Sequence, residues 1–323
     1  MSKNLYDSAL LHISLPTLST ITDYHKDLIK ASVNRVSSLL TILISCSEIN
    51  HYANDPLSGW TRVHNLLSAL YVFGTKVAYE TDKPFLDIDI IFDKWCGYQV
   101  EVSNDRHFNV LFGHITENVR LQQFNETRKN SLLSNLPIHI IESKIPPPSF
   151  DLIDSNKIPL QPSNPKTFDH VAVGGTFDHL HSGHKVLLTM TAWITGKRLI
   201  CGVTDDTMLE NKKFKDLLES IDTRIAKVKQ FLESIRRGLI YEVIPIYDAY
   251  GPTTTDAEIK AIVISKETMN GAHSINKERE KKGFQPLHLS IIEVISSSNP
   301  SLSEDELKNL KLSSTYLRFM KSN

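Results

Sequence analysis

The stretch VGGTFDHLHSGH, residues 173–184, decides the fold of the C-terminal half of the chain. It follows a short apolar run that is typical of a buried strand and leads into an amphipathic segment that is typical of a helix. Gly174 and Gly175 allow the backbone to turn sharply and to approach a ligand without a Cβ in the way. His181 and His184 flank a glycine at the helix start, where free N–H groups and the helix dipole favour an anion. The stretch therefore predicts a strand-to-helix turn that binds phosphate.

The segments around this turn alternate between strand and helix. Short apolar runs predict strands at 168–173, 198–203, 241–246, 261–264 and 287–292. Helical periodicity predicts helices at 185–195, 223–235 and 267–282, with a last helix at 316–320. Apolar strands separated by helices of this length indicate a parallel sheet covered on both faces. We therefore expect a Rossmann-like α/β domain whose ligand lies at the carboxyl ends of its strands.

A proline-rich stretch separates this half from the rest of the chain. Six of the 14 prolines fall within residues 143–166, a density that neither a helix nor a central strand tolerates. We therefore expect an extended linker there, between an N-terminal domain at 1–142 and a C-terminal domain at 167–323. The N-terminal part shows helical patterns at 28–43 and 60–77 and strand-like patterns at 85–92 and 137–141. These patterns predict a second α/β unit, whose role they do not identify.

Composition and charge exclude several classes of protein. A net charge of -1 gives no global field that recruits nucleic acid or an anionic membrane. Cys46, Cys96 and Cys201 lie far apart without CxxC spacing, which favours free thiols in a reducing compartment over disulfides or a metal site. The N-terminus lacks the apolar core of a signal peptide, and no apolar run is long enough to span a bilayer. We expect a cytoplasmic or nuclear soluble protein that binds neither nucleic acid nor membrane.

Two further polar groups stand where a phosphate site would need them. Lys212 and Lys213 follow the second predicted strand of the C-terminal half, at the sheet edge that holds the turn 173–184. A lysine there can neutralise charge shared between two reacting phosphates. The hydroxyl run 313–315 comes before Arg318 at the start of the last predicted helix. Hydroxyls and free N–H groups at a helix start can hold phosphate oxygens.

The extended motif GGTFDHLHSGH resembles the (H/T)xGH nucleotidyltransferase superfamily and, within it, the phosphopantetheine adenylyltransferases of eukaryotes and archaea. The resemblance covers roughly residues 168–320, about half of the chain. It implies an enzyme of coenzyme A biosynthesis that transfers AMP from ATP, bound with Mg²⁺, to 4′-phosphopantetheine, giving dephospho-coenzyme A and pyrophosphate. It also implies that Thr176 and His184 lie at the transferring phosphate and that His181 contacts the ATP phosphates.

The resemblance also implies binding residues elsewhere. One lysine of the pair Lys212 and Lys213 is implied as catalytic, and the spacing to Arg224 slightly favours Lys212. The implied ATP-binding residues are Gly174, Gly175, Phe177, Gly183, Lys266, Gly271, Arg279, Ser313, Ser314, Thr315 and Arg318. The implied acceptor-binding residues are Thr176, Arg224, Tyr250, Gly251, Pro252 and Thr253. At Asn270 and His273 bacterial relatives would have arginines, so the source of triphosphate contacts in that segment stays open.

Three other interpretations stay open. A cytidylyltransferase or another adenylyltransferase of the same superfamily would share the motif and differ only in its substrates. Asp87 and Asp89, which follow Gly74 and Thr75, superficially resemble the carboxylate pair with which polymerase-β-like transferases hold two metal ions. The competing interpretation of that segment is an alternating strand with both carboxylates outward. Finally, residues 1–142 would serve as a non-catalytic docking domain for a pathway partner, such as a separate dephospho-coenzyme A kinase.

Overall fold

The computed structural model describes residues 5–18, 21–103, 106–148, 167–210, 212 and 214–292. The chain forms two compact units, Met1–Pro165 and Lys166–Asn323. The helix predicted at 316–320 lies outside the described residues, as does most of the proline-rich stretch at 143–166.

The C-terminal unit contains a parallel sheet of five strands in the order β10-β9-β6-β7-β8. The strands are β6 (Phe168–Gly175), β7 (Thr195–Thr204), β8 (Ile240–Ile246), β9 (Ala261–Ser265) and β10 (His288–Ile292). The main helices are α5 (Ser182–Ile194), α6 (Ile221–Ile235) and α7 (Met269–Lys281). The predicted Rossmann-like parallel sheet is confirmed, and each predicted strand overlaps an observed one.

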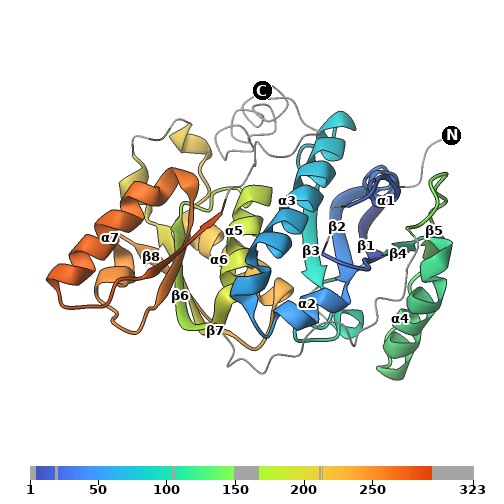
Figure 1. Ribbon diagram of the computed structural model, residues 1–323. Helices are drawn as coiled ribbons and strands as arrows, with labels where there is room; N and C mark the ends of the chain where they lie inside the picture. The colour runs from blue at the N-terminus through green and yellow to red at the C-terminus, as the bar shows by residue number, and fades with distance from the viewer. Residues whose placement is uncertain are drawn as a thin grey trace. The chain divides into compact units, whose positions relative to one another are not determined.

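Helices cover both faces of this sheet (Figure 1). Ala172 and Ile262 of the strands share one buried cluster with Ala272 of α7. Side chains alternate along a strand, so the buried Val171 and Val173 point to the opposite face, on which α5 and α6 pack against each other. Burial on both faces explains why these strands are continuous apolar runs in the sequence.

The strand order creates a topological switch point between β6 and β9. From β6 the chain proceeds to β7 and β8 on one side, and it then crosses to β9 and β10 on the other side. The connections that leave β6 and β9 therefore diverge at the carboxyl edge, where open α/β sheets bind ligands. The turn before α5 and the residues after β9 border this point.

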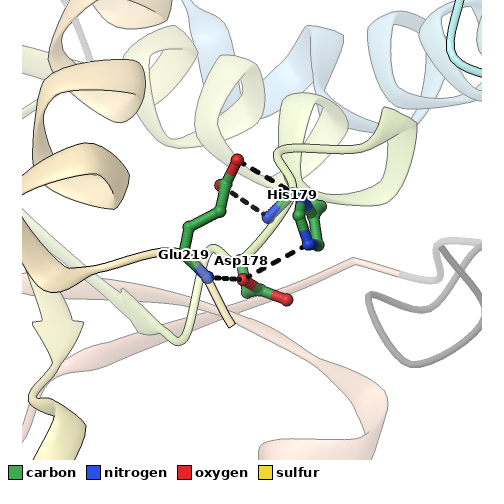
Figure 2. A group of neighbouring side chains, drawn as sticks. All are labelled: Asp178, His179 and Glu219. Carbon is green, nitrogen blue, oxygen red and sulfur yellow. Dashed lines mark hydrogen bonds and ion pairs between the residues drawn. The ribbon is translucent and has the colours of Figure 1, made fainter. Parts of the chain in front are cut away.

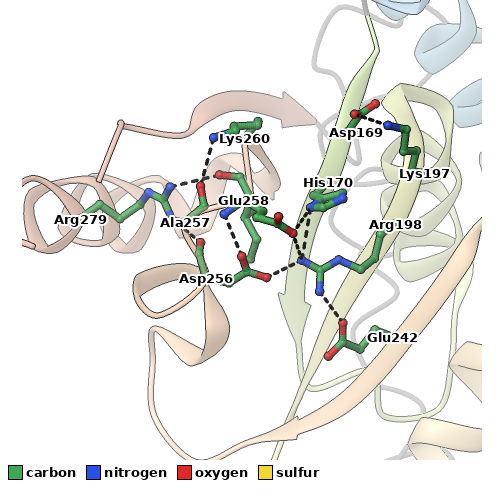
Figure 3. Close-up of polar contacts among 11 residues, drawn as sticks. Asp169, His170, Lys197, Arg198, Glu242, Asp256, Ala257, Glu258, Lys260 and Arg279 are labelled. Atoms are coloured by element: carbon green, nitrogen blue, oxygen red, sulfur yellow. Dashed lines mark hydrogen bonds and ion pairs between the residues drawn. The ribbon is translucent and has the colours of Figure 1, made fainter. Parts of the chain in front are cut away.

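The opposite, amino edge of the sheet is closed by a network around Arg198 (Figure 3). The guanidinium forms ion pairs with Asp256 and, at 3.1 Å, with Glu242. It also lies 3.3 Å from Nδ1 of His170, which is itself 3.3 Å from Glu258. These contacts connect β6, β7 and β8 to the segment that leads into β9. The charged side chains of this network therefore pair with one another.

The N-terminal unit repeats the architecture, with a parallel sheet in the order β3-β2-β1-β4-β5. Its strands are β1 (Tyr6–Ser14), β2 (Val36–Ser45), β3 (Asp87–Phe92), β4 (Val110–Gly113) and β5 (Ile138–Ile140). Its helices include α1 (Asp23–Val33), α2 (Ser47–Tyr52), α3 (Pro56–Glu80) and α4 (Asn118–Asn130) (Figure 1). The second α/β unit is confirmed. In the described part of the chain, no helix is both long and apolar enough to cross a membrane.

The helix predicted at 28–43 is wrong in its second half. The helix α1 ends at Val33, and β2 begins at Val36. The run 36–45 is rich in apolar residues, and periodicity alone cannot separate such a buried strand from a helix. Parallel pairing with β1 and β3 on either side decides the conformation. The helix predicted at 60–77 lies within α3 and is confirmed.

The two carboxylates of β3 differ in their surroundings. Ile88 and Ile90 are buried and Asp87 is exposed, as alternation along a strand predicts. Asp89, however, is buried and lies 2.6 Å from Arg106, so the outward position predicted for it is wrong. Its carboxylate is neutralised by a cation of the protein, which speaks against the polymerase-β-like pair of metal ions.

Polar side chains join the strand ends at the carboxyl edge of the N-terminal sheet. The buried His12 lies 2.9 Å from Ser45 through Nε2 and 2.9 Å from Glu117 through Nδ1. The Ser45 hydroxyl donates to Asp93 at 3.0 Å, and Asp93 pairs with Arg120 at 2.9 Å. These contacts connect the ends of β1, β2 and β3 with the beginning of α4.

Candidate active site at the carboxyl edge of the C-terminal sheet

The turn between β6 and α5 holds two non-glycine residues in the left-handed region. Phe177 has a φ of 52° and His179 a φ of 44°, and such residues cost about 1–3 kcal/mol each unless the surroundings hold them. The Phe177 side chain is fully buried and lies against Gly175, where an added Cβ would be 3.2 Å from the Phe177 ring. Packing therefore fixes the turn at Phe177 and favours glycine at position 175. The Phe177 side chain is enclosed by the core, and the ATP contact implied for this residue stays a prediction.

The two histidines of the motif form a stacked pair at the N-terminus of α5. Nδ1 of His181 accepts a hydrogen bond from the Gly183 N–H at 3.1 Å, which caps the helix and explains why α5 begins before Lys185. The rings of His181 and His184 are 3.8 Å apart between centroids and 23° from parallel. Since Nδ1 of His181 is an acceptor, the neutral ring carries its proton on Nε2.

Both imidazoles are half-buried, and their surroundings favour the uncharged form. Desolvation, together with the neighbouring charges of Lys185 and His179, lowers the pKa of His181 to about 3. Desolvation and the proximity of His181 lower the pKa of His184 well below its usual value. Within the described residues, Nδ1 of His184 is buried without a hydrogen-bond partner. The pair therefore offers neutral N–H donors beside a helix N-terminus, an arrangement that suits oxygens of an anionic ligand.

Arg224 lies close to Thr176 but not in the manner that the resemblance implied. Its guanidinium is fully buried and donates at 2.8 Å to the backbone carbonyls of both Thr176 and Thr204. It also donates to the carbonyl of Glu219 at 3.0 Å and forms an ion pair with Asp206. These donors hold the ends of β6 and β7 together, and the acceptor contact implied for Arg224 stays a prediction.

The predicted lysine pair is described only in part. Lys212 is exposed in the loop after β7, and its backbone N–H donates to the Leu209 carbonyl at 3.0 Å. Lys213 lies outside the described residues. The loop leaves the same sheet edge as the histidine pair, so the choice between the two lysines stays a prediction.

The loop after β8 places a tyrosine at this edge. Oδ1 of Asp248 accepts from the N–H groups of Tyr250 and Gly251, at 2.8 and 2.7 Å. Gly251 has a φ of 48°, and the loop continues through Pro252 in a short 3-10 helix. Tyr250 is 38% exposed, whereas Thr253 is buried and donates its hydroxyl to the Tyr250 carbonyl. Thr253 is therefore not accessible in this structure, whereas Tyr250 is exposed, and the acceptor contacts of this loop stay predictions.

In the segment after β9, too, some of the predicted residues are exposed and another is buried. Lys266 and Gly271 are exposed near the carboxyl edge, and a Cβ added at Gly271 would meet nothing within 4 Å. Arg279 lies ten residues into α7, roughly 15 Å along the helix axis at its usual rise per residue. It is fully buried and donates to the carbonyls of Thr253, Ile259 and other residues. The Arg279 guanidinium thus donates to backbone carbonyls in this structure, and its predicted contact with the nucleotide stays a prediction. Ser313, Ser314, Thr315 and Arg318 lie outside the described residues.

Two carboxylates of the site had no role in the sequence prediction. Asp178 is fully buried and accepts the Glu219 N–H at 2.9 Å. Glu219 in turn accepts the His179 N–H at 2.9 Å. Asp178 is part of the motif and is visible in the sequence. Its partner Glu219 stands 41 positions later, and no sequence pattern predicts their contact.

Asp178, His179 and Glu219 bring ligand atoms close enough together to suggest a metal ion (Figure 2). Their hydrogen bonds argue otherwise, because Oδ1 of Asp178 faces the Glu219 N–H and the Glu219 carboxylate pairs with Lys227. A magnesium ion requires an octahedron of oxygens, several of them from water or substrate phosphates. This cluster therefore does not suit a resident magnesium ion.

Several known proteins resemble the C-terminal half of the chain, and one matches nearly the whole chain. The family Cytidylyltransferase-like matches residues 172–319. The phosphopantetheine adenylyltransferase of Saccharomyces cerevisiae is 43% identical over 157 residues, which are 49% of this chain and 50% of that protein. The phosphopantetheine adenylyltransferase of Pyrococcus abyssi is 41% identical over 132 residues, 40% of this chain and 82% of that protein. An uncharacterized protein of Schizosaccharomyces pombe is 31% identical over 318 residues, 96% of this chain and 95% of that protein. The chain thus spans about half the length of the budding-yeast relative, and the fission-yeast protein matches it almost from end to end.

Proposed function

The chain belongs to the phosphopantetheine adenylyltransferase family, and from this membership we propose that it transfers AMP from ATP to 4′-phosphopantetheine. The products are dephospho-coenzyme A and pyrophosphate. The observation that carries the proposal is the stacked pair of uncharged imidazoles, His181 and His184, at the start of α5 and beside the switch point of the sheet.

The proposed reaction needs no general base from the protein. A phosphate monoester carries a second negative charge near neutral pH, because its second pKa lies near 6. One of its oxygens attacks the α-phosphorus of ATP, the new P–O bond forms, and the bond to the bridging oxygen breaks as pyrophosphate leaves. The enzyme must align the two phosphates and stabilise the charge that builds up between them.

The residues at the carboxyl edge take distinct parts in this proposal. The uncharged N–H groups of His184 and His181 donate to phosphate oxygens, and the Thr176 hydroxyl adds a third donor. Lys212 or Lys213 neutralises the like charges that approach each other. Tyr250, exposed after β8, is the candidate contact for the acceptor.

Magnesium enters this proposal as part of the nucleotide. ATP carries the ion on its phosphates, where it keeps most of its water ligands and adds positive charge beside the leaving pyrophosphate. Lys266, exposed after β9, and the predicted hydroxyl run at 313–315 are candidates for the remaining phosphate contacts.

For the N-terminal unit we propose docking to a pathway partner, such as a separate dephospho-coenzyme A kinase. The joined network of His12, Ser45 and Glu117 at its carboxyl edge supports a stable folded module. The three free and buried cysteines support a reducing compartment such as the cytoplasm.

Pyrophosphate release by the full chain tests the proposed activity. ATP with 4′-phosphopantetheine is expected to give rapid release, whereas CTP with the same acceptor and ATP without an acceptor are expected to give little. Equal or faster release with CTP would assign the chain to a cytidylyltransferase activity instead. Release from ATP that does not depend on 4′-phosphopantetheine would contradict the proposed acceptor.

A further inference from the structure

We propose that Glu219 is a positioning residue, which holds the turn before α5 so that His181 and His184 face the reacting phosphates. The proposal rests on the proposed function for its catalytic consequence. It concerns a residue that touches neither substrate, and it acts through the backbone of His179.

The Glu219 carboxylate contacts His179 at two points (Figure 2). Oε2 accepts the His179 N–H at 2.9 Å, and Oε1 lies 3.3 Å from the ring nitrogen Nδ1. Lys227, two turns into α6, pairs with Oε1. Burial alone would raise the pKa of Glu219. The hydrogen bond and charge of Lys227, together with the His179 N–H, lower this pKa overall. Glu219 therefore contacts His179 as an ionised carboxylate.

Backbone groups of residues 217–219 make further hydrogen bonds to the turn before α5. The Glu219 N–H donates to Oδ1 of Asp178 at 2.9 Å, and the Leu217 carbonyl lies 3.0 Å from Nε2 of His179. The segment 217–219 therefore runs along the turn and contacts it through both side chain and main chain. The Glu219 carbonyl also accepts from Arg224, which ties the segment to the end of β6.

The turn needs such support because it is conformationally strained. His179 adopts a φ of 44° two positions before His181, the cap of α5. Without an acceptor for its N–H, the left-handed backbone at His179 is free to relax, and the cap residue moves with it. A displacement of about 1 Å of a group that stabilises the transition state can lower a rate roughly 10²-fold. Ground-state binding of ATP, which is spread over many contacts, is less sensitive.

The decisive variant is Glu219→Gln, which keeps the size of the side chain but removes its charge and leaves a single acceptor oxygen, so that it cannot accept from the His179 N–H and from Lys227 at the same time. We expect kcat to fall about 10- to 100-fold while the KM for ATP changes less than about threefold. The matched control is Glu233→Gln on α6, the helix that follows Glu219, because Glu233 is 52% exposed and lies 4.0 Å from Lys229. We expect this control to retain wild-type kcat. A thermal melt of each variant shows that it is folded.

The second readout is the titration of the His181 ring, followed by NMR between pH 5 and 8. Burial lowers the pKa of His181 to about 3, so the wild-type ring stays neutral over this range. In Glu219→Gln the turn admits water, and the ring is expected to titrate within the range. If Glu219→Gln does not fold, Glu219→Asp replaces it, because one methylene less prevents simultaneous contact with His179 and Lys227.

The two readouts separate this proposal from the proposed function. A variant with normal kcat, or with reduced kcat but a His181 ring that still does not titrate, would overturn the positioning role. If the wild-type chain itself fails to adenylylate 4′-phosphopantetheine, the proposed function fails, while the titration of His181 still decides whether Glu219 holds the turn.

Discussion

His181 and His184 stack with their ring centroids 3.8 Å apart, and burial lowers the pKa of both. The native state therefore binds fewer protons than the unfolded chain, in which a histidine titrates near pH 6.5. The contribution of these two histidines to the free energy of unfolding is fully present above that pH. It is lost as the pH falls below about 6.5, by up to about 1.4 kcal/mol per pH unit for each histidine, and for His181 the loss continues toward pH 3.

This difference predicts a pH-dependent free energy of unfolding for the full chain. Urea denaturation at pH 7 and pH 5 is expected to show a smaller loss of stability in the double variant His181→Gln, His184→Gln than in the wild type. An equal loss in both proteins would mean that the imidazoles are hydrated and titrate normally in the folded state.

The second prediction concerns His184→Ala. If the imidazole stabilises charge that develops only in the transition state, its loss lowers kcat by roughly 10²–10³ and leaves the KM for ATP nearly unchanged. Steady-state kinetics with ATP and 4′-phosphopantetheine measure both constants, and His107→Ala at an exposed position of the N-terminal unit is the control. A change in KM alone would show that His184 serves ground-state binding.

The third prediction separates the observed role of Arg224 from the predicted one. Lysine cannot reach the carbonyls of Thr176, Thr204 and Glu219 at once, so Arg224→Lys is expected to lose about 2–3 kcal/mol of unfolding free energy. We also expect a lower kcat, since the end of β6 loses its fixed position. An acceptor-binding arginine would behave differently: the variant would keep its stability and raise only the KM for 4′-phosphopantetheine.

The sequence was sufficient to predict the C-terminal sheet and the turn at which the candidate site lies. Doubly covered strands are apolar throughout, and the glycine-rich turn marks the strand that borders the switch point. It could not assign Arg224 and Arg279, since an arginine that binds phosphate and one that ties backbone carbonyls have the same neighbours in sequence. The partner of Asp178 was equally hidden, because the contact with Glu219 depends on how two loops meet.

The N-terminal unit was harder to predict for a different reason. The strand β2 is apolar from Leu39 to Ile44 apart from Thr41, and no period distinguishes it from the helix that precedes it. Only the pairing with β1 and β3, both distant in sequence, stabilises the extended conformation. Long-range pairing is the part of a fold that local patterns do not contain.

The fourth prediction decides between Lys212 and Lys213. The lysine at the reacting phosphates is expected to lose most of its kcat when replaced by Ala, and Arg is not expected to restore it fully, because a planar fork does not replace a compact ammonium. The other lysine is expected to tolerate Ala, and we favour Lys212 as the active one. Near-normal turnover in both alanine variants would place this loop outside the site.

The last prediction is that residues 160–323 alone retain adenylyl transfer. The histidine pair, the lysine loop and the exposed Tyr250 all belong to the unit Lys166–Asn323, which has its own sheet and its own buried cluster. The fragment is therefore expected to fold and to keep its kcat within a few-fold of the full chain, measured by pyrophosphate release with ATP and 4′-phosphopantetheine. Circular dichroism establishes that the fragment is folded, and His184→Ala in the fragment is the control for background hydrolysis. A folded fragment without activity would show that the N-terminal unit takes part in the reaction, and the docking role proposed for it would then be too narrow.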